Sequence, residues 1–405
     1  MTIKALQGWT REHTHAVTAS YLAWTMDAFD FFILVFVLGD IAKEFHTKVP
    51  QIALAVTLTL AMRPVGAFIF GRLADRYGRR PILMINIAVY SLLSFSTAFV
   101  SDLTMFLVVR TLFGIGMGGI WGISTSLAFE SIKTHARGMV SGLLQSGYSG
   151  GYLIASVIFA LLFVHIGWRG MFMVGIIPAL LLIPYIYTAV PESPVFRQSK
   201  ATRISIFSVL QRHAKLAIYA IILMTAFNFF SHGTQDFYPT FMSKGRGFAP
   251  AVAGSIAIIY NIGAILGCFL FGPLSQHFGR RRMMIVAALL ALPTTWLWAF
   301  SPSIVLLTAG AFMINFFVQG CWSMIPIYLN ELSPPEARGT FPGTVYQLGN
   351  LFASGNLAIQ AWIAEYNGDY GIALAAVPIC AGLVIALLVS QGPEADNVEL
   401  GSVSH

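Results

Sequence analysis

The sequence predicts an all-α membrane protein with twelve transmembrane helices in two six-helix bundles. Of its 405 residues, 57% are hydrophobic and only 10% are charged, whereas soluble domains carry about 25% charged residues. A helix needs roughly 20 apolar residues to cross a bilayer, and twelve apolar runs of about that length follow one another along the chain. The strands of a membrane barrel are shorter and alternate in polarity, so these runs indicate a helical bundle in lipid.

Short polar connections separate the expected spans. The spans cover residues 17–39, 52–71, 82–100, 104–127, 138–164, 170–190, 214–242, 251–271, 283–300, 303–329, 340–363 and 371–390. The first is of full length and contains Asp27 and Asp30, which distinguishes it from the short apolar core of a cleavable signal peptide. The three cysteines all stand in spans without the spacing of a metal site, so we expect packing residues and no metal.

The distribution of basic residues predicts the topology. The net charge is +7, and most of the 24 Lys and Arg fall in the tails and in every second connection. Cytoplasmic loops of membrane proteins carry such an excess of Lys and Arg. We therefore expect both termini in the cytoplasm and a multi-pass protein of the cell's inner (plasma) membrane, with the bilayer rather than nucleic acid as its partner.

An internal repeat divides the chain into an N-terminal bundle, residues 1–190, and a C-terminal bundle, residues 214–390. A basic linker, 191–213, joins them, and a tail, 391–405, follows. Residues 71–80, GRLADRYGRR, reappear 201 residues later at 272–281 as GPLSQHFGRR. At the same offset Glu130, Arg137, Gly138 and Gly142 match Glu331, Arg338, Gly339 and Gly343. Parallel duplication of this kind is typical of transporters that rock about a site at the membrane midplane.

Charged residues at the cytoplasmic rim are candidates for a gate. Acceptors are available at Asp75, Glu130 and Glu331, and planar donors at Arg79, Arg137, Arg280 and Arg338. Pairs among them would close the cytoplasmic side and open it by exchanging partners. The alternative is that these charges only set topology, since an exposed pair contributes about 0–1 kcal/mol.

Three charges lie near the middle of the first two spans: Asp27, Asp30 and Arg63. Each such ion costs roughly 2.5–3.5 kcal/mol at a helix centre, which implies pairing or a wet cavity. Arg63 is a candidate for binding a substrate carboxylate, because the guanidinium fork matches a carboxylate. The aspartates are then candidates for balancing Arg63 and for proton coupling. A purely structural Asp–Arg pair is the alternative.

Span seven carries a polar stripe on one helical face. Asn228, Ser231, His232, Gln235 and Asp236 recur at i, i+3, i+4, i+7 and i+8. Asn228 and Ser231 stand 201 residues after Asp27 and Asp30, so the stripe is expected to face the same central cavity. A histidine and a carboxylate one turn apart can exchange a proton, which makes His232 and Asp236 candidates for proton coupling, and Asn228 and Ser231 candidates for substrate binding.

Further polar residues in the spans are candidates for substrate contacts. Span eleven contributes Gln347 and Asn350, and span five contributes Tyr148. Each is suited to hydrogen-bond the hydroxyl or carbonyl group of a small solute. The alternative is interhelical hydrogen bonding, worth roughly 0.6 kcal/mol per bond.

At these motifs the chain resembles the major facilitator superfamily. The GRLADRYGRR loop resembles the superfamily's loop between helices two and three, Arg110-Thr-Leu-Phe-Gly114 its helix-four arginine motif, and Pro191-Glu-Ser-Pro194 its helix-six ending. The resemblance covers about residues 15–390. It implies the major facilitator fold and says nothing about the substrate.

Span seven resembles one branch more closely. The lactate/pyruvate:proton symporters, grouped with bacterial sialate permeases as the sialate:proton symporter family, carry N-x-x-[ST]-H-x-[ST]-Q-D-x-x-x-T there. Residues 228–240 fit every fixed position. The resemblance implies that Asn228, His232 and Asp236 serve recognition and proton coupling, and Gln347 and Asn350 resemble a pair in helix eleven of monocarboxylate permeases.

The sequence therefore predicts proton-coupled uptake of a short monocarboxylate such as lactate or pyruvate, by a protein expected to act as a monomer. No Gly-x-x-x-x-Gly-Lys-[Ser/Thr] run occurs, so neither ATP nor another cofactor is expected, with the proton as coupling ion. The rivals are a symporter of sialate or of aromatic acids and, from another class, a sensor that binds the acid without moving it. The short tail after span twelve argues against a sensor, and no catalytic constellation suggests an enzyme.

Overall fold

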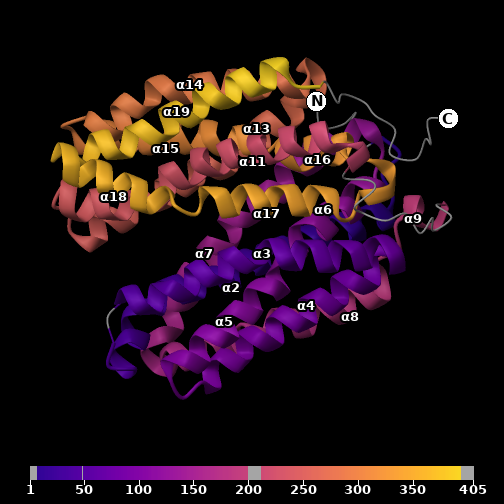
Figure 1. The fold of residues 1–405 in the computed structure, drawn as a ribbon, viewed down its shortest axis with the longest axis horizontal. Coiled ribbons are helices and arrows are strands. Elements are labelled where there is room, and N and C mark those ends of the chain that lie inside the picture. The colour runs from indigo at the N-terminus through magenta and orange to yellow at the C-terminus, as the bar shows by residue number, and fades with distance from the viewer. Residues whose placement is uncertain (1–6, 48, 199–210, 394–405) are drawn as a thin grey trace.

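The computed structural model describes residues 7–47, 49–198 and 211–393, and this part of the chain is built of helices (Figure 1). The long helices of the first half are α2 (Arg11–Glu44), α3 (Val49–Tyr77), α4 (Arg79–Ser96), α5 (Leu103–Gly118) with α6 (Ile120–Ser131), α7 (Arg137–Val174) and α8 (Ile176–Ala189). Those of the second are α11 (Ala214–Gln235), α13 (Pro250–Phe278), α14 (Arg280–Phe300), α15 (Ile304–Trp322) with α16 (Ile325–Leu332), α17 (Phe341–Ala353) with α18 (Asn356–Asn367), and α19 (Tyr370–Gln391).

The helices confirm the predicted all-α membrane fold. Within the described residues, ten helical segments are long and apolar enough to cross a bilayer. The two expected spans outside that set, 138–164 and 340–363, are helical as well. The first is rich in Gly and Ser, and its helix α7 continues past a non-helical turn at Gly167, where φ is 62°. The second is broken between α17 and α18, at residues 354–355.

The helices form two groups that lie side by side (Figure 1). Helices α2 to α8 make up one group, here called the N-half, and helices α11 to α19 make up the other, the C-half. The start of α2 and the end of α19 lie at one end of the molecule, here called the terminal end, and the opposite end is called the far end. The short helix α9 (Pro194–Gln198) also lies at the terminal end. Of the predicted linker and tail, residues 199–210 and 394–405 lie outside the described residues, and the domain boundaries stay a prediction.

Glycines bring the two halves into backbone contact near the terminal end. A Cβ atom on Gly71 would lie 2.8 Å from the carbonyl oxygen of Gly339, and one on Gly138 would lie 2.6 Å from that of Gly272. These two contacts are the same contact seen twice, because Gly71 and Gly272 are equivalent in the repeat, as are Gly138 and Gly339. Any side chain at these positions would force the halves apart, so the glycines permit closure of this end.

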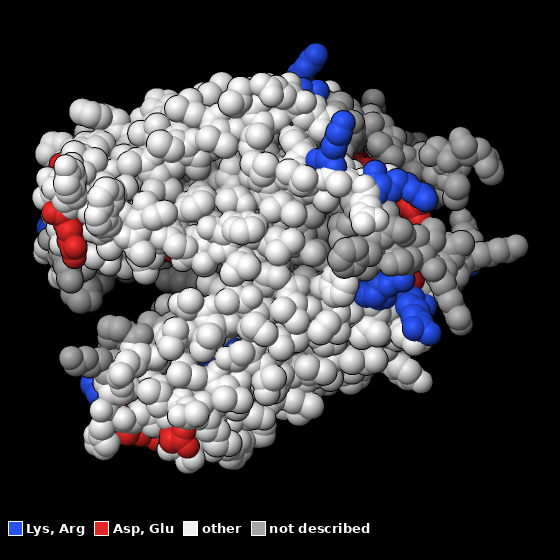
Figure 2. Space-filling model, in the orientation of Figure 1, with Lys and Arg blue, Asp and Glu red and all other residues white. Residues whose placement is uncertain are grey.

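At the far end the two halves separate. Figure 2 shows a hollow between them on that side, while the Lys and Arg side chains visible on this face gather mainly at the terminal end. The broad surface between the two ends is almost without charge, as expected for helices that face lipid. The molecule is therefore closed at the basic, terminal end and open at the other.

Candidate functional site

Arg63 and Asp27 form a buried ion pair in the N-half. Nη2 of Arg63, on α3, donates to Oδ2 of Asp27, on α2, at 2.7 Å, and the side chains are only 5% and 1% exposed. Within the described residues, Nε of Arg63 and Oδ1 of Asp27 have no hydrogen-bond partner. The pair is thus held by one bond rather than by two parallel ones, which leaves donor capacity on Arg63.

Asp30 lies apart from the Arg63–Asp27 pair, although both aspartates were predicted as partners of Arg63. Its Oδ1 accepts a hydrogen bond from Ser94 on α4 at 3.0 Å. The nearby cation is Arg110 on α5, whose guanidinium lies 3.8 Å from the centre of the Phe113 ring. All three guanidinium nitrogens of Arg110 are buried without a hydrogen-bond partner in the described part of the chain. The structure therefore pairs Arg63 with Asp27 and places Asp30 near Arg110.

In the C-half, His232 connects two helices through hydrogen bonds. Its Nδ1 lies 3.2 Å from Oδ1 of Asp236, one turn further along α11, and its Nε2 lies 3.0 Å from Oδ1 of Asn350 on α17. Asn350 in turn donates from Nδ2 to Oε1 of Gln347 at 3.4 Å. Although they lie on a membrane-spanning helix, His232 and Asp236 keep 23% and 32% of their side-chain surface exposed. Water can therefore reach the pair.

The chain of hydrogen bonds continues beyond Asp236. Oδ2 of Asp236 accepts from Asn356 at 3.3 Å, and the same Asn356 nitrogen lies 3.0 Å from Oε1 of Gln360. Gln360 donates onward to the carbonyl oxygens of Gly233 and Ala373. Asn356 begins α18, immediately after the break in span eleven, so the break positions an amide on the carboxylate.

Asn356 and Gln360 were missed by the sequence reasoning. Their signal is the one that identified Gln347 and Asn350, namely two amide side chains spaced along one face of an apolar span. Gln319, on α15, was missed as well. It donates to Oγ of Ser231 at 3.1 Å and accepts from Gln145 of the N-half at 3.3 Å.

The other predicted residues of the stripe, Ser231 and Asn228, form hydrogen bonds with different partners. Ser231 accepts from Gln235 at 3.0 Å in addition to Gln319, so it forms part of a polar bridge between the halves. Asn228 is buried, and its amide donates to the carbonyl of Met224 on its own helix at 2.8 Å. The stripe therefore divides into a buried end at Asn228 and a hydrated end at His232 and Asp236.

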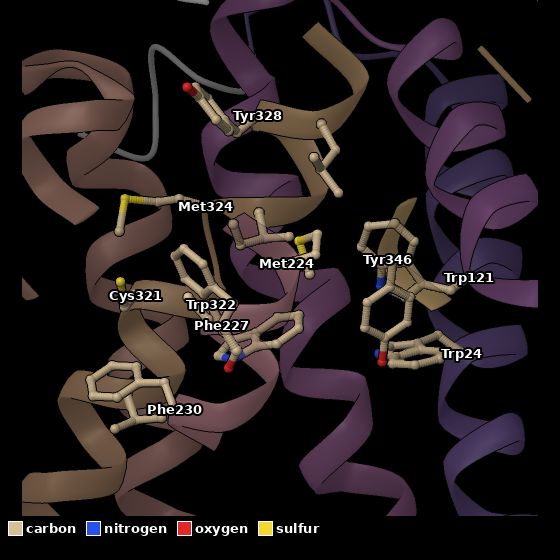
Figure 3. Close-up of a cluster of buried hydrophobic side chains, with 14 of the residues drawn as sticks. Trp24, Trp121, Met224, Phe227, Phe230, Cys321, Trp322, Met324, Tyr328 and Tyr346 are labelled. Carbon is tan, nitrogen blue, oxygen red and sulfur yellow. The ribbon is translucent and has the colours of Figure 1, made fainter. Parts of the chain in front are cut away.

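Aromatic side chains surround this polar region. Tyr148 stacks on Trp24 within the N-half, with ring centres 5.8 Å apart. The ring centres of Trp121 in the N-half and Tyr346 in the C-half lie 4.7 Å apart. Figure 3 shows Trp24, Trp121 and Tyr346 together, with Phe227 and Trp322 forming a second group nearby. Flat, largely apolar side chains thus lie on the same helices as several of the polar residues that were predicted to bind substrate.

Asp75 forms the most complete contact across the halves at the terminal end. Its Oδ1 accepts from the backbone nitrogen of Gly339 at 2.7 Å, and its Oδ2 accepts from the Thr340 hydroxyl at 2.5 Å. Arg79, one turn away, holds the same carboxylate at 3.2 Å. Gly339 and Thr340 directly precede α17, so the carboxylate lies at the positive end of a helix of the opposite half.

The remaining predicted gate residues form pairs within and between the halves. Arg79 contacts both oxygens of Glu130 at 3.0 and 3.1 Å, and Arg280 contacts both oxygens of Glu331 at 3.3 Å. These two pairs are repeat equivalents inside each half. Arg137 reaches across to Glu331 at 4.0 Å, and the carbonyl of Arg338 accepts from Ser126 of the N-half at 2.8 Å.

The segment that follows span six also stabilises the terminal end, through Glu192. Glu192, just beyond α8, accepts from the backbone nitrogens of Arg79 and Arg80 and so caps the start of α4. Burial raises the pKa of Glu192, and these backbone hydrogen bonds oppose that rise by stabilising the carboxylate. The carboxylate therefore fixes the loop that carries Arg79.

The chain belongs to the Major Facilitator Superfamily, whose sequence profile matches residues 21–249 and 221–402. A putative metabolite transport protein of Haemophilus influenzae is 30% identical over 376 residues, which span 89% of this chain and 92% of that protein. The sialic acid transporter NanX of Escherichia coli is 27% identical over 383 residues, spanning 92% and 93% of the two chains. The protein is thus a membrane transporter of small organic molecules, not an enzyme.

The fold is that of solved transporters of the superfamily. The proton:xylose symporter XylE superposes with a TM-score of 0.78 at 18% sequence identity, and the match covers 96% of this chain and 98% of XylE. At this identity the likeness concerns the fold alone. It confirms the predicted fold class and leaves the substrate to the chemistry of the site.

Proposed function

We propose that the protein imports a short monocarboxylate, such as lactate or pyruvate, together with one proton. The observation that carries this proposal is the arrangement of charge on the two halves. Arg63 retains donor capacity on one side, and the hydrated His232–Asp236 pair lies on the other, within electrostatic reach of Arg63. A fixed cation suits a carboxylate, and a histidine–carboxylate pair suits a proton.

The helix-seven motif supports the finer assignment. The segment 228–240 matches the pattern of the lactate/pyruvate:proton symporters at all fixed positions. His232 lies at hydrogen-bond distance from Asp236 of this motif and from Asn350 of the amide pair in span eleven. These contacts join the motif in span seven to the amides in span eleven, as a shared site requires.

In the proposed cycle, the far end faces outward and both termini lie in the cytoplasm of a cell whose inner membrane holds the protein. A proton enters at His232 and Asp236, and the anion binds Arg63 in place of part of the Asp27 contact. Bound together, the two ligands bring no net charge, so the halves can rock without moving charge through the low-dielectric interior. The Asp75 contact with Gly339 and Thr340 would break as the terminal end opens and re-form on the return.

A second candidate is a larger acid with a flat or ring-shaped body. The aromatic side chains Trp24, Trp121, Tyr148 and Tyr346 beside the polar residues favour such a substrate, since ring faces stack with one another. NanX, with 27% identity, is a sialic acid transporter, which makes sialate a second acid to test.

Counterflow in proteoliposomes tests both candidates. The purified protein is loaded with unlabelled acid, and the entry of labelled lactate, pyruvate, sialate or benzoate is compared with and without an imposed pH gradient. We expect exchange of lactate or pyruvate, and accumulation that requires an inward proton gradient. Exchange restricted to sialate or benzoate would support the second candidate, and accumulation that ignores the gradient would refute proton coupling.

A further inference from the structure

The hydrogen bonds around His232 form a chain from Asp236 through His232 and Asn350 to Gln347. At its Asp236 end, the ionised carboxylate can only accept. Asp236, an acceptor when ionised, lies 3.2 Å from Nδ1 of His232. On the other side of the ring, Nε2 faces Asn350 at 3.0 Å, and Asn350 faces Gln347 at 3.4 Å. While Asp236 is ionised it can only accept, so Nδ1 then carries a hydrogen. The protonation of His232 is therefore decided at Nε2, the nitrogen that faces the amide.

An amide responds to the state of Nε2 by its orientation. When Nε2 carries a hydrogen, it needs an acceptor and Asn350 must present its oxygen; when Nε2 is bare, it needs a donor and Asn350 must present its NH2 group. In the structure, both ring nitrogens face oxygens, and Asn350 directs its NH2 group to the oxygen of Gln347. This arrangement fits the doubly protonated imidazolium, the proton-loaded form of the site.

We propose that Asn350 and Gln347 form an amide relay that reports the protonation of His232 to the anion-binding site. The proposal rests on the proposed function and extends it by naming the residues that link the two ligands. With His232 protonated, Gln347 accepts from Asn350, and its own NH2 group remains available as a donor. Within the described residues, the side chain of Gln347 makes no other hydrogen bond.

Loss of the Nε2 proton to water reverses the chain. Asn350 turns its NH2 group toward His232, its oxygen then faces Gln347, and Gln347 turns its NH2 group toward Asn350. The oxygen of Gln347 then has no partner in the chain and is the group that Gln347 presents to the anion site. A carboxylate is attracted by an NH2 group and repelled by a carbonyl oxygen, so the anion is held firmly only while the proton is bound.

The position of Gln347 connects this chain to the anion site. Gln347 is buried on α17, and α17 packs against α3, the helix that carries Arg63. The guanidinium of Arg63 retains an unpartnered Nε in the described part of the chain. A carboxylate that binds between the halves could therefore accept from Arg63 on one side and from Gln347 on the other.

Other charged and titratable groups face His232 as well. Asp236 on α11 stabilises a positive ring, and Arg63 on α3 opposes it, with Asp27 paired to that arginine. Tyr148 on α7 and Tyr260 on α13 lie within electrostatic reach of Asp236, and both are neutral near pH 7. Through-space attraction between the imidazolium and the anion thus adds to the relay, and the test must separate the two.

The test measures how the affinity of the full-length protein for lactate, with pyruvate as a second probe, depends on pH between 6 and 8. For one fully linked proton, the dissociation constant rises about tenfold per pH unit once His232 loses its proton. Gln347→Leu removes the relay but keeps the imidazolium and its charge. We expect it to weaken binding at pH 6 and to reduce the slope to about threefold per unit or less, because only the through-space part remains.

Gln145→Leu serves as the matched control. Gln145 lies between the halves but bonds to Gln319 instead of to the His232 chain. It should retain the slope of the unmodified protein even if its affinity changes. A Gln347→Leu protein that keeps the full slope would overturn the relay, whereas absence of lactate and pyruvate exchange in the unmodified protein would instead refute the proposed function.

Asn350→Leu and the double variant Asn350→Leu/Gln347→Leu complete the experiment. Because the two amides act in series, each single change should remove the same pH-dependent part, and the double change should remove no more. Residues that act as one unit are non-additive in this way. Losses of slope that add up in the double variant would show two independent contacts and would contradict the relay.

Discussion

Helices α2 and α11 occupy equivalent positions in the two repeats, yet they present different chemistry to the cleft. Where α2 carries Asp27 and Asp30, α11 carries Asn228 and Ser231, and the counterpart of Arg63 is Ala264. In the N-half a buried ion pair, 5% and 1% exposed, holds fixed charge. In the C-half a hydrated histidine and carboxylate form a chain of amide hydrogen bonds.

The difference between the two helices indicates that each half of the duplicated fold is suited to one of the two ligands. Arginine keeps its charge at neutral pH, and Arg63 is buried against Asp27, so the N-half presents a fixed cation, which suits the binding of an anion. A histidine that water can reach changes charge readily, which suits a proton. The symmetric fold brings the two kinds of site together, and the asymmetric substitutions let one ligand depend on the other.

The largest expected effect comes from removing the fixed charge. Arg63→Ala should weaken lactate binding by about 2–5 kcal/mol, or roughly 30-fold and more, because an anion would lose its charged partner. Binding is measured by equilibrium dialysis of the detergent-purified protein. Arg63→Ala also leaves Asp27 as a lone buried carboxylate, so loss of binding alone could reflect poor folding.

The double variant Asp27→Asn/Arg63→Ala removes that complication, because it contains no uncompensated buried charge. It should fold, as judged by size-exclusion chromatography and thermal unfolding, and still fail to bind. Near-normal affinity in this variant would show that the Arg63–Asp27 pair is only structural.

The next effect concerns the titratable half. His232→Ala should abolish uphill accumulation of lactate, by more than about tenfold relative to the unmodified protein, because the coupling proton loses its site. Counterflow at saturating lactate should continue within about threefold. His277→Ala, at an exposed histidine near the end of α13, is the control and should keep pH-driven accumulation. Accumulation in His232→Ala that still follows the pH gradient would remove His232 from the coupling step.

A smaller effect is expected from the partner of His232. Asp236→Asn keeps a hydrogen-bond acceptor for Nδ1 but removes the negative charge that favours the imidazolium. The pH at which uptake falls to half should move to the acid side by about one unit, the lower end of what an adjacent opposite charge contributes. Asn356→Ala loses the bonds to Asp236 and Gln360 but leaves the carboxylate in place, so it should move the profile less. An unshifted profile for Asp236→Asn would separate the carboxylate from the proton site.

The two halves also differ in how much the sequence could predict. The offset of 201 residues was enough to place α11 opposite α2 and to match the glycines that meet at the terminal end. Residue type alone could not decide between Asp27 and Asp30 as the partner of Arg63, because both lie on the same helix and only packing separates them. The amides Asn356 and Gln360 were visible in span eleven, but the contact of Asn356 with Asp236 depends on the helix break at residues 354–355, which no strong signal such as proline marks.

The smallest expected effect concerns the terminal end, where the repeat provides its own control. Asp75 accepts from Gly339 and Thr340 of the C-half, while its counterpart Gln276 accepts from the Gly138 nitrogen of the N-half at 3.1 Å. A charged acceptor forms the stronger bond, contributing about 1.5–3 kcal/mol against about 1 kcal/mol for a neutral one. Asp75→Asn should therefore shift the equilibrium away from the closed terminal end, and Gln276→Asp should shift it slightly the other way.

Spin labels at Ser101 and Asn367, which are exposed at the far end of each half, report the equilibrium between the open and closed terminal end. The distance between the labels is measured by pulsed electron paramagnetic resonance. Cys380 is replaced first, because it is exposed while Cys268 and Cys321 are buried. Asp75→Asn should raise the population with a short label distance by about two- to thirtyfold, the range that follows from about 0.5–2 kcal/mol. Equal distance distributions in both variants would mean that the other contacts between the halves keep the terminal end closed without the charge of Asp75.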